Sequence, residues 1–299
     1  MLDPVILAQI LWTGIATSAP YVLMTAAFAL TLKVTGLWNF AQAGLMAIAF
    51  YTMFFVIDAL GLPLVFALLA GVVVTAAASL LIEIYGLQVF RDRGSGSLTF
   101  FIFTLILSEF IIYVLTLLFG TEPETLFKSI LSPVTIIGNI AVSDWDELAV
   151  TTAIIGMAAL YVFLTWTREG QFMNAVADNA RLAELYGISA KRAWRVTAVV
   201  AALFVVAAMY LIGTHGGVVP NSPLELIITA VIGTLLGGIG RVFAASAAAV
   251  FLGLLQSFSI LIIASRWQNL LLYGVLFAAI LLFPRGVRMP RWRLILAGR

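Results

Sequence analysis

The chain has 299 residues, of which 63% are hydrophobic and 10% are charged, and its net charge is +2. Soluble domains usually carry about 25% charged residues, so lipid must be the solvent for much of this chain, and the small net charge gives no sign of a nucleic-acid partner. The absence of cysteine and the single histidine exclude a disulfide framework and a thiolate metal site, so we expect no metal, no cofactor and no catalytic residue in this chain.

Nine apolar runs follow one another, and about 20 apolar residues suffice for a helix that crosses a bilayer. The runs are Val5–Leu32, Ala43–Leu60, Leu64–Phe90, Leu98–Phe119, Leu148–Trp166, Trp194–Ile212, Leu224–Ile239, Phe243–Ile263 and Leu270–Phe283. Pro20 leaves open whether the first run is one segment or two. The Gly-rich segment near 224–240 is expected to be broken or re-entrant. The sequence predicts an all-α polytopic membrane helix bundle of about 8–9 segments, formed by one transmembrane domain over residues 1–299.

Basic residues indicate the orientation, because they concentrate in cytoplasmic loops. If all nine runs cross the bilayer, Arg91, Arg93, the loop at about 167–193 and the basic tail at about 285–299 fall on one face. The opposite face collects acidic residues. We therefore predict a multi-pass protein of the bacterial cell inner membrane, with a cytoplasmic C-terminus and a periplasmic N-terminus. Tryptophans near run ends, such as Trp194, fit an aromatic belt at the membrane interface.

Polar residues interrupt the pattern after the first run, where Asn39, Gln42 and Gly44 follow Gly36. Irregular backbone at membrane depth is tolerated where it lines a cavity or is buried in protein. Asn39 and Gln42 are therefore candidates for the substrate pathway. The alternative is a polar junction between helices with close glycine packing.

Two acidic residues, Glu83 and Glu109, lie inside apolar runs, where charged groups are costly. Glu83 lies near the cytoplasmic end of its run, and we interpret it as a structural ion pair or a capping acid about two turns before Arg91. Glu109 lies nearer to mid-membrane. It is a candidate for the substrate pathway, with a hydrogen bond between helices as the alternative.

The cytoplasmic loop at 167–193 is too polar to cross the membrane and too regular to be a linker. Two sets of its residues recur at helical spacing, namely Phe172, Val176, Asn179 and Ala183, and Leu182, Leu185 and Tyr186. Its charges include Asp178, Arg181 and Glu184. Gly187 predicts a helix stop, and Ser189 can cap the next helix. The loop is either an ordinary amphipathic helix or a docking helix for a soluble partner. The chain has no nucleotide-binding motif, so any ATP that drives transport must be hydrolysed by a partner.

Two later segments also offer candidates. His215 lies at the predicted outer end of a helix and is either a loop residue or a contact for substrate or a binding protein. The glycines of the next run serve either close packing or a gate hinge; they are Gly233, Gly237, Gly238 and Gly240.

The chain resembles the branched-chain amino acid (LivH-type) permeases of ABC transporters from about residue 10 to about residue 288. The stretches that carry the resemblance are Gly170–Asn179, Ala183–Ile188, Asn39–Ala41, Ala230–Gly233, Leu236–Gly240 and Pro284–Gly286. Departures occur at Gln42-Ala43-Gly44, where the family has His-Gly, and at Gln171, Phe172 and Asn174, where it often has arginines or small residues.

The resemblance implies an ABC importer and identifies the loop as its ATPase-coupling element, with Gly170, Asp178, Arg181, Glu184 and Gly187 as coupling residues. It also implies a second permease subunit that is homologous or identical, two cytoplasmic ATPase subunits that use ATP and Mg, and an extracytoplasmic substrate-binding protein. A branched-chain or other amino acid is the expected substrate. Urea, short amides and aromatic carboxylates are alternatives within the class, and a stand-alone channel or secondary transporter is the alternative outside it.

Overall fold

The computed structural model describes residues 4–127, 133–261 and 267–282. Its helices are α1 (Pro4–Thr35), α2 (Ala41–Asp58), α3 (Leu64–Leu81), the π-helix η1 (Ile82–Leu87), α4 (Gln88–Asp92), α5 (Ser97–Phe119), α6 (Asp144–Trp166), α7 (Arg168–Leu185), α8 (Ala190–His215), α9 (Ser222–Gly237), α10 (Val242–Ser259) and α11 (Gln268–Leu282). The helices α3, η1 and α4 run on as one span. The predicted all-α membrane bundle is confirmed, and the basic tail at 285–299 lies outside the described residues.

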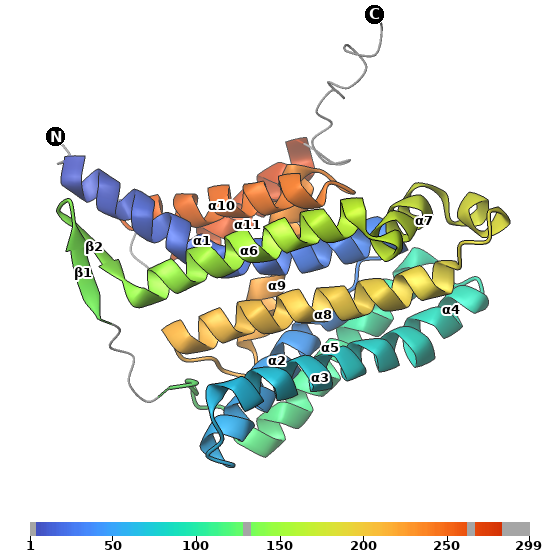
Figure 1. Cartoon of the computed structure of the whole chain (residues 1–299), viewed down its shortest axis with the longest axis horizontal. Coiled ribbons are helices and arrows are strands. Elements are labelled where there is room, and N and C mark those ends of the chain that lie inside the picture. The colour runs from blue at the N-terminus through green and yellow to red at the C-terminus, as the bar shows by residue number, and fades with distance from the viewer. Residues whose placement is uncertain (1–3, 128–132, 262–266, 283–299) are drawn as a thin grey trace, which may run out of the picture.

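Seven helices in the described ranges are long and apolar enough to cross a membrane, and α9 is a shorter apolar helix. The first of them, α1, continues through Pro20 without a break, so the first apolar run is one segment. Neighbouring helices compensate for a proline in a membrane helix. Those neighbours are present here, since α1 packs against α6, α8, α9 and α10 and is the most buried of the seven. Figure 1 shows it running through the bundle between α8 and α10.

The two ends of the bundle differ in character (Figure 1). One end carries a hairpin of β1 (Val134–Ile137) and β2 (Ile140–Ser143), which the sequence reading did not predict. Its turn places Gly138 and Asn139 at positive φ, as two-residue hairpins require. The side chain of Gln9 in α1 holds this hairpin through both backbone groups of Ala141. The other end carries α4 and α7, with the basic residues that the sequence places in the cytoplasm.

The glycine-rich segment contains no break within its helix, contrary to the expected broken segment, because α9 runs unbroken from Ser222 to Gly237. α9 ends at Gly237, a short loop follows, and α10 begins at Val242. Gly238 and Gly240 both have positive φ, of 94° and 85°, and glycine adopts this conformation without steric cost. With 16 residues, α9 is about 24 Å long, which is shorter than the hydrocarbon core of about 30 Å.

Candidate functional site

The candidate coupling helix α7 begins at a sharp corner after α6. The Thr167 hydroxyl caps it by accepting from the backbone N–H of Gly170 at 3.1 Å. The same glycine lies against the end of α6, because a Cβ built on it would lie 2.1 Å from the carbonyl oxygen of Phe163. No side chain fits at that distance. Gly170 is therefore required by the geometry of the corner itself.

The spacing of apolar residues predicts a continuous helix through Asn179, and this prediction is wrong at that residue. Asn179 has extended backbone angles, φ −161° and ψ 102°, and divides α7 into two parts. Its side-chain oxygen accepts from the N–H of Leu182 at 3.0 Å, so it caps the second part. The break separates Asp178 from Arg181, and no ion pair joins them within the described chain.

The end of α7 lies where the sequence predicts it. Gly187 has φ +80° and follows the last helical turn, as a glycine helix stop does. The Ser189 hydroxyl then accepts from the N–H of Arg192 at 3.3 Å and caps α8. The predicted helix stop and helix cap are both confirmed.

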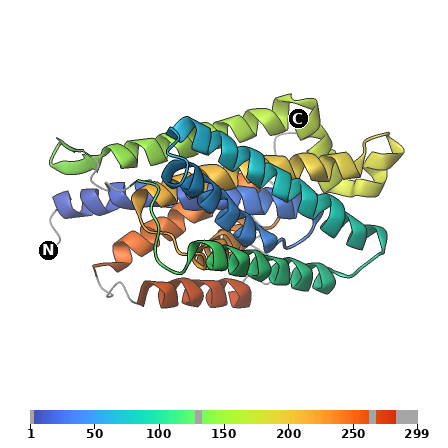
Figure 2. The same ribbon diagram turned by 90° about the horizontal axis from the view of Figure 1, so that it is seen from below.

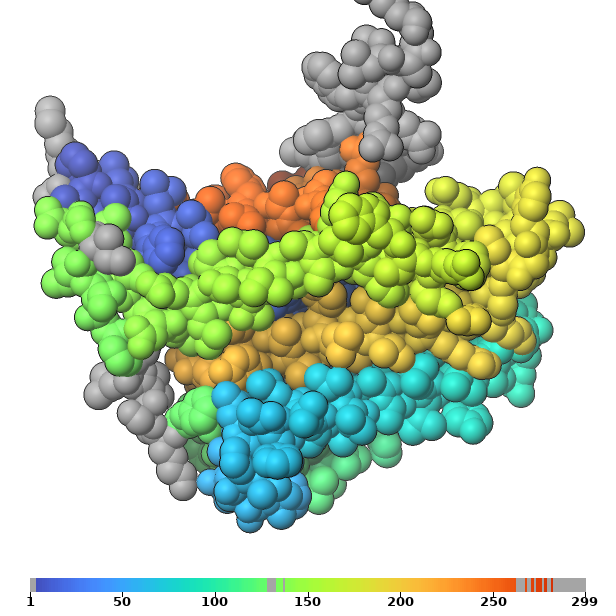
Figure 3. Space-filling view, in the orientation of Figure 1, coloured from blue at the N-terminus to red at the C-terminus, as the bar shows by residue number. Residues whose placement is uncertain are grey.

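Side chains from Asp178 to Tyr186, around and after the break at Asn179, form an exposed surface that we name the coupling surface. Three of its members are large and apolar, with Leu185 and Tyr186 84% and 80% exposed and Leu182 50% exposed. The other members are the exposed charged residues Asp178, Arg181 and Glu184. Figure 3 shows α7 at one end of the molecule. Apolar side chains that project beyond the membrane helices and have a charged rim are typical of a protein docking site.

α7 is fixed to three membrane helices. The Lys33 ammonium at the end of α1 donates to the Asn174 side-chain oxygen at 2.6 Å, and the Asn174 amide donates to the carbonyl of Leu164 in α6 at 3.0 Å. Glu169 forms an ion pair with Arg192 in the first turns of α8. These contacts fix the first part of α7, which precedes the coupling surface in the chain, to α1, α6 and α8.

Glu109 lies near the middle of α5, which is at the edge of the bundle (Figure 2). Its side chain is exposed, and no hydrogen bond or ion pair to it forms within the described residues. Its exposed neighbours Ile106, Phe110 and Tyr113 are apolar or aromatic. An acidic side chain facing lipid at this depth costs about 2.5–3.5 kcal/mol on insertion scales. The Glu109 side chain is thus poorly suited to lipid and better suited to contact water, a solute or another subunit.

Asn39 and Gln42 lie at the junction between α1 and α2. Only residues 36–40 are irregular, so Gln42 and Gly44 belong to α2, in contrast to the wider interruption that the sequence suggests. The Asn39 side-chain oxygen accepts from the N–H of Ala41 at 3.1 Å. The Gln42 amide donates to the Thr31 hydroxyl at 2.8 Å, which joins the two helices. Its oxygen is buried without a partner in the described chain.

His215 is the last residue of α8 and borders a cavity of about 320 Å³. Its ring stacks on that of Trp145, with centroids 3.9 Å apart. The Trp145 indole N–H donates to the carbonyl of Leu211 and to the Thr214 hydroxyl. Polar side chains from α1 and α10 also line the cavity, among them Thr13, Thr17, Gln256 and Ser257.

The four candidate hinge glycines have two different structural roles. A Cβ on Gly233 would lie 3.0 Å from Thr25 of α1, and one on Gly237 would lie 2.3 Å from the backbone of Ala245 in α10. These two glycines allow close packing. Gly238 and Gly240 instead supply the turn between α9 and α10.

The predicted substrate-pathway residues do not share one cavity. His215 borders the cavity of about 320 Å³, Asn39 and Gln42 border a much smaller one, and Glu109 borders neither. Sequence reasoning also missed a partner of Arg91. Trp194, interpreted as an interface tryptophan, lies beneath the Arg91 guanidinium, 4.1 Å from it. Neither residue type nor spacing carries a signal for this contact.

Comparisons with known proteins agree over nearly the whole chain. Residues 10–281 match the family described as branched-chain amino acid transport system / permease component. The high-affinity branched-chain amino acid transport system permease protein LivH of Escherichia coli K12 is 25% identical, over 93% of this chain and 94% of that protein. BraD of Pseudomonas aeruginosa, which has the same description, is 23% identical over the same shares. A solved structure of PsaBC from Streptococcus pneumoniae in complex with Fab is similar with a TM-score of 0.49 and 15% identity, covering 96% of this chain and 94% of that one.

Proposed function

We propose that this chain, which belongs to the permease family of branched-chain amino acid transport systems, is one of two permease subunits of an inner-membrane importer for branched-chain amino acids. Two cytoplasmic ATPase subunits with bound ATP and Mg drive the importer, and an extracytoplasmic binding protein delivers the substrate. The N-terminus lies on the periplasmic side and the C-terminus in the cytoplasm. LivH and BraD, whose descriptions name this substrate class, support the choice.

The coupling surface is the observation that carries the proposal. Leu182, Leu185 and Tyr186 are exposed at the end of the molecule that holds the basic residues, and lipid does not cover a segment as polar as α7. A soluble subunit that binds there transmits its movement to α1, α6 and α8 through the contacts of Asn174 and Glu169. Gly238 and Gly240 then serve as the hinge between α9 and α10.

The first test is purification of the tagged chain from its native membrane in mild detergent, followed by uptake of radiolabelled leucine by the complex in proteoliposomes. We expect a second permease and ATPase subunits to co-purify, and uptake to require ATP and the binding protein. The inhibition of leucine uptake by unlabelled urea, short amides and aromatic carboxylates shows which of these solutes the importer also binds. A chain that purifies alone and transports without ATP would instead support a stand-alone channel or secondary transporter.

The outer face of α5 is proposed to line the solute path, with Glu109 as the group that pairs with the substrate ammonium. A hydrogen bond to a charged group contributes about 1.5–3 kcal/mol, so Glu109→Gln should lower the initial rate of leucine uptake roughly 10- to 100-fold. Glu109→Asp keeps the charge and should retain most of the rate. If Glu109→Gln transports leucine as wild type does, the carboxylate has no part in the path.

A further inference from the structure

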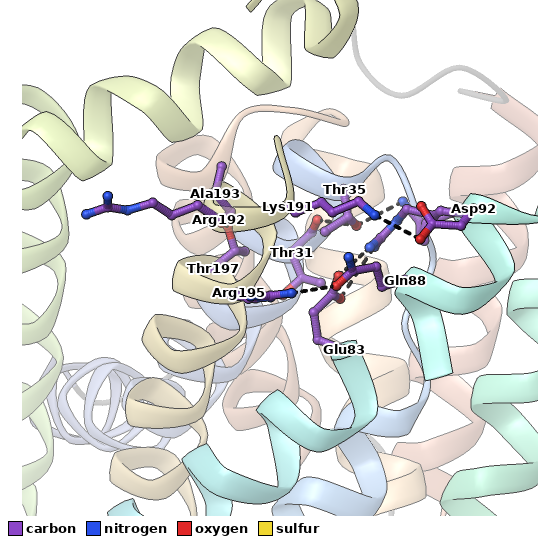
Figure 4. A network of polar contacts seen from close by, with 12 residues as sticks. Thr31, Thr35, Glu83, Gln88, Asp92, Lys191, Arg192, Ala193, Arg195 and Thr197 are labelled. Carbon is purple, nitrogen blue, oxygen red and sulfur yellow. Dashed lines mark hydrogen bonds and ion pairs between the residues drawn. The ribbon is translucent and has the colours of Figure 1, made fainter. Parts of the chain in front are cut away.

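A buried cluster of charged and aromatic side chains joins the start of α8 to η1 and α4. Figure 4 shows the polar contacts around Glu83 in this cluster. Glu83 and Arg91 form an ion pair in which the two side chains are only 4% and 11% exposed. A second contact joins Arg91 Nη2 to Glu83 Oε2 at 3.4 Å. The Arg91 guanidinium stacks on Trp194 of α8. We name Glu83, Arg91 and Trp194 the buried clamp.

The backbone beneath the clamp is unusual. The N–H of Gln88 donates to the carbonyl of Glu83, five residues earlier, which is the hydrogen-bond pattern of a π-helix. Single π-helical turns are rare and occur often at functional sites. The Gln88 side chain then accepts from the Arg195 guanidinium at 3.1 Å (Figure 4). Two successive residues of α8, Trp194 and Arg195, therefore hold the π-helical segment.

The other side of this segment packs on α5. The Phe90 ring of α4 lies 4.9 Å from the Phe103 ring and 6.0 Å from the Phe100 ring, centroid to centroid. A Cβ on Gly86 would lie 2.8 Å from the Phe103 ring, so η1 and α5 are in close contact. These contacts continue the connection from α8 through the clamp to the helix that carries Glu109.

The clamp also borders a cavity of about 10 Å³ shared with Asn39 and Gln42, which has room for about one water molecule. The Gln42 oxygen and the Trp194 indole N–H that line it are both buried without partners in the described chain. Buried polar atoms without partners cost about 1–3 kcal/mol each. One water molecule in this cavity can satisfy polar atoms of α2 and α8 at once, beside the clamp.

We propose that the buried clamp is a positioning element, which passes the movement of the coupling surface from α8 through η1 and α4 to α5. This inference rests on the proposed importer function. Arg91 is its central residue, because it joins Glu83 within its own span and Trp194 in the neighbouring helix. Its planar guanidinium can stack and form an ion pair at the same time, which a lysine ammonium cannot do equally well.

The test compares two double variants in the purified complex. Removing one member of a buried ion pair leaves a stranded charge, whereas replacing both is often neutral for stability, so the clamp variant is Glu83→Gln with Arg91→Met. The matched control is Asp92→Asn with Lys191→Met. It removes an ion pair between α8 and α4, at 2.8 Å, whose two side chains are about half exposed. Such exposed pairs contribute about 0–1 kcal/mol.

We expect both variants to assemble with the ATPase subunits and to hydrolyse ATP. Leucine transported per ATP hydrolysed should fall at least about tenfold in the clamp variant and change less than about twofold in the control. Trp194→Leu should lower the leucine transported per ATP as much as the clamp variant does. Trp194→Phe should retain the wild-type ratio, because it keeps an aromatic face for Arg91. Both Trp194 variants keep the ion pair of Glu83 and Arg91, so neither buried charge loses its partner. Wild-type coupling in the clamp variant and in Trp194→Leu would overturn the proposal.

Hydrogen exchange of the purified chain gives a readout that needs no ATPase. Amides of residues 82–92 and 190–197 should exchange at least about tenfold faster in the clamp variant than in the control. Unchanged exchange would overturn the clamp itself. Faster exchange with unaltered coupling would make the clamp merely structural. A wild-type complex without ATP-driven uptake would refute the proposed function, and with it the positioning role, whatever the exchange result.

Discussion

Gly170→Ala is expected to lower the rate of ATP-driven uptake at least about 100-fold, because the added methyl group collides with the backbone of α6. The ideal Cβ lies 2.1 Å from the Phe163 carbonyl oxygen and 2.6 Å from the Leu164 Cα, and neither atom is a flexible side-chain end. Overpacking of this kind costs about 1–3 kcal/mol or more. The corner between α6 and α7 must open, which moves the coupling surface away from its partner.

Uptake in proteoliposomes and the apparent melting temperature of the purified chain measure this effect. We expect the melting temperature to fall by about 2–12 °C, since 1 kcal/mol corresponds to roughly 2–4 °C in a domain of about 150–250 residues. Gly96→Ala is the matched control, because Gly96 has φ −76° and no atom within 4 Å of its ideal Cβ. Equal behaviour of the two variants would show that the corner tolerates a side chain.

The order and type of the membrane segments can be predicted from the sequence, because a long apolar run in lipid must satisfy its own backbone hydrogen bonds and therefore forms a helix. The helix stop at Gly187 and the helix cap at Ser189 can also be predicted from the sequence, since local backbone chemistry determines them. Asn179 is different. Its spacing fits a helix, and only the competition between its side chain and the backbone for the N–H of Leu182 breaks it.

The candidate site can be predicted from the sequence only in part, as Glu83 and Trp194 illustrate. The pairing of Glu83 with Arg91 can be anticipated because both lie in one span. The contact of Arg91 with Trp194 joins residues about a hundred positions apart, and it depends on how α8 packs against η1. The exposed position of Glu109 also depends on packing, because the sequence gives its depth but not the direction of its side chain.

The double variant Leu185→Ala with Tyr186→Ala should abolish binding of the ATPase subunits. Large residues at the centre of an interface often contribute 2 kcal/mol or more each, so the pair should weaken the complex about 100- to 1,000-fold. Both side chains are more than three-quarters exposed in the free chain, so their removal leaves no cavity, and the melting temperature of the chain alone should hardly change. Co-purification of the tagged chain measures the loss.

The hairpin at the opposite end provides a matched control for this variant. Val134 and Ile136 are also exposed and apolar, with 59% and 77% exposure, but they lie on the predicted periplasmic side. Their replacement by alanine should leave ATPase binding intact, because no ATPase reaches that face. If the hairpin variant lost the ATPases and the α7 variant kept them, the orientation of the chain would be the reverse of the one proposed. If both variants kept them, α7 would be an ordinary loop helix and the ATPases would have to bind elsewhere.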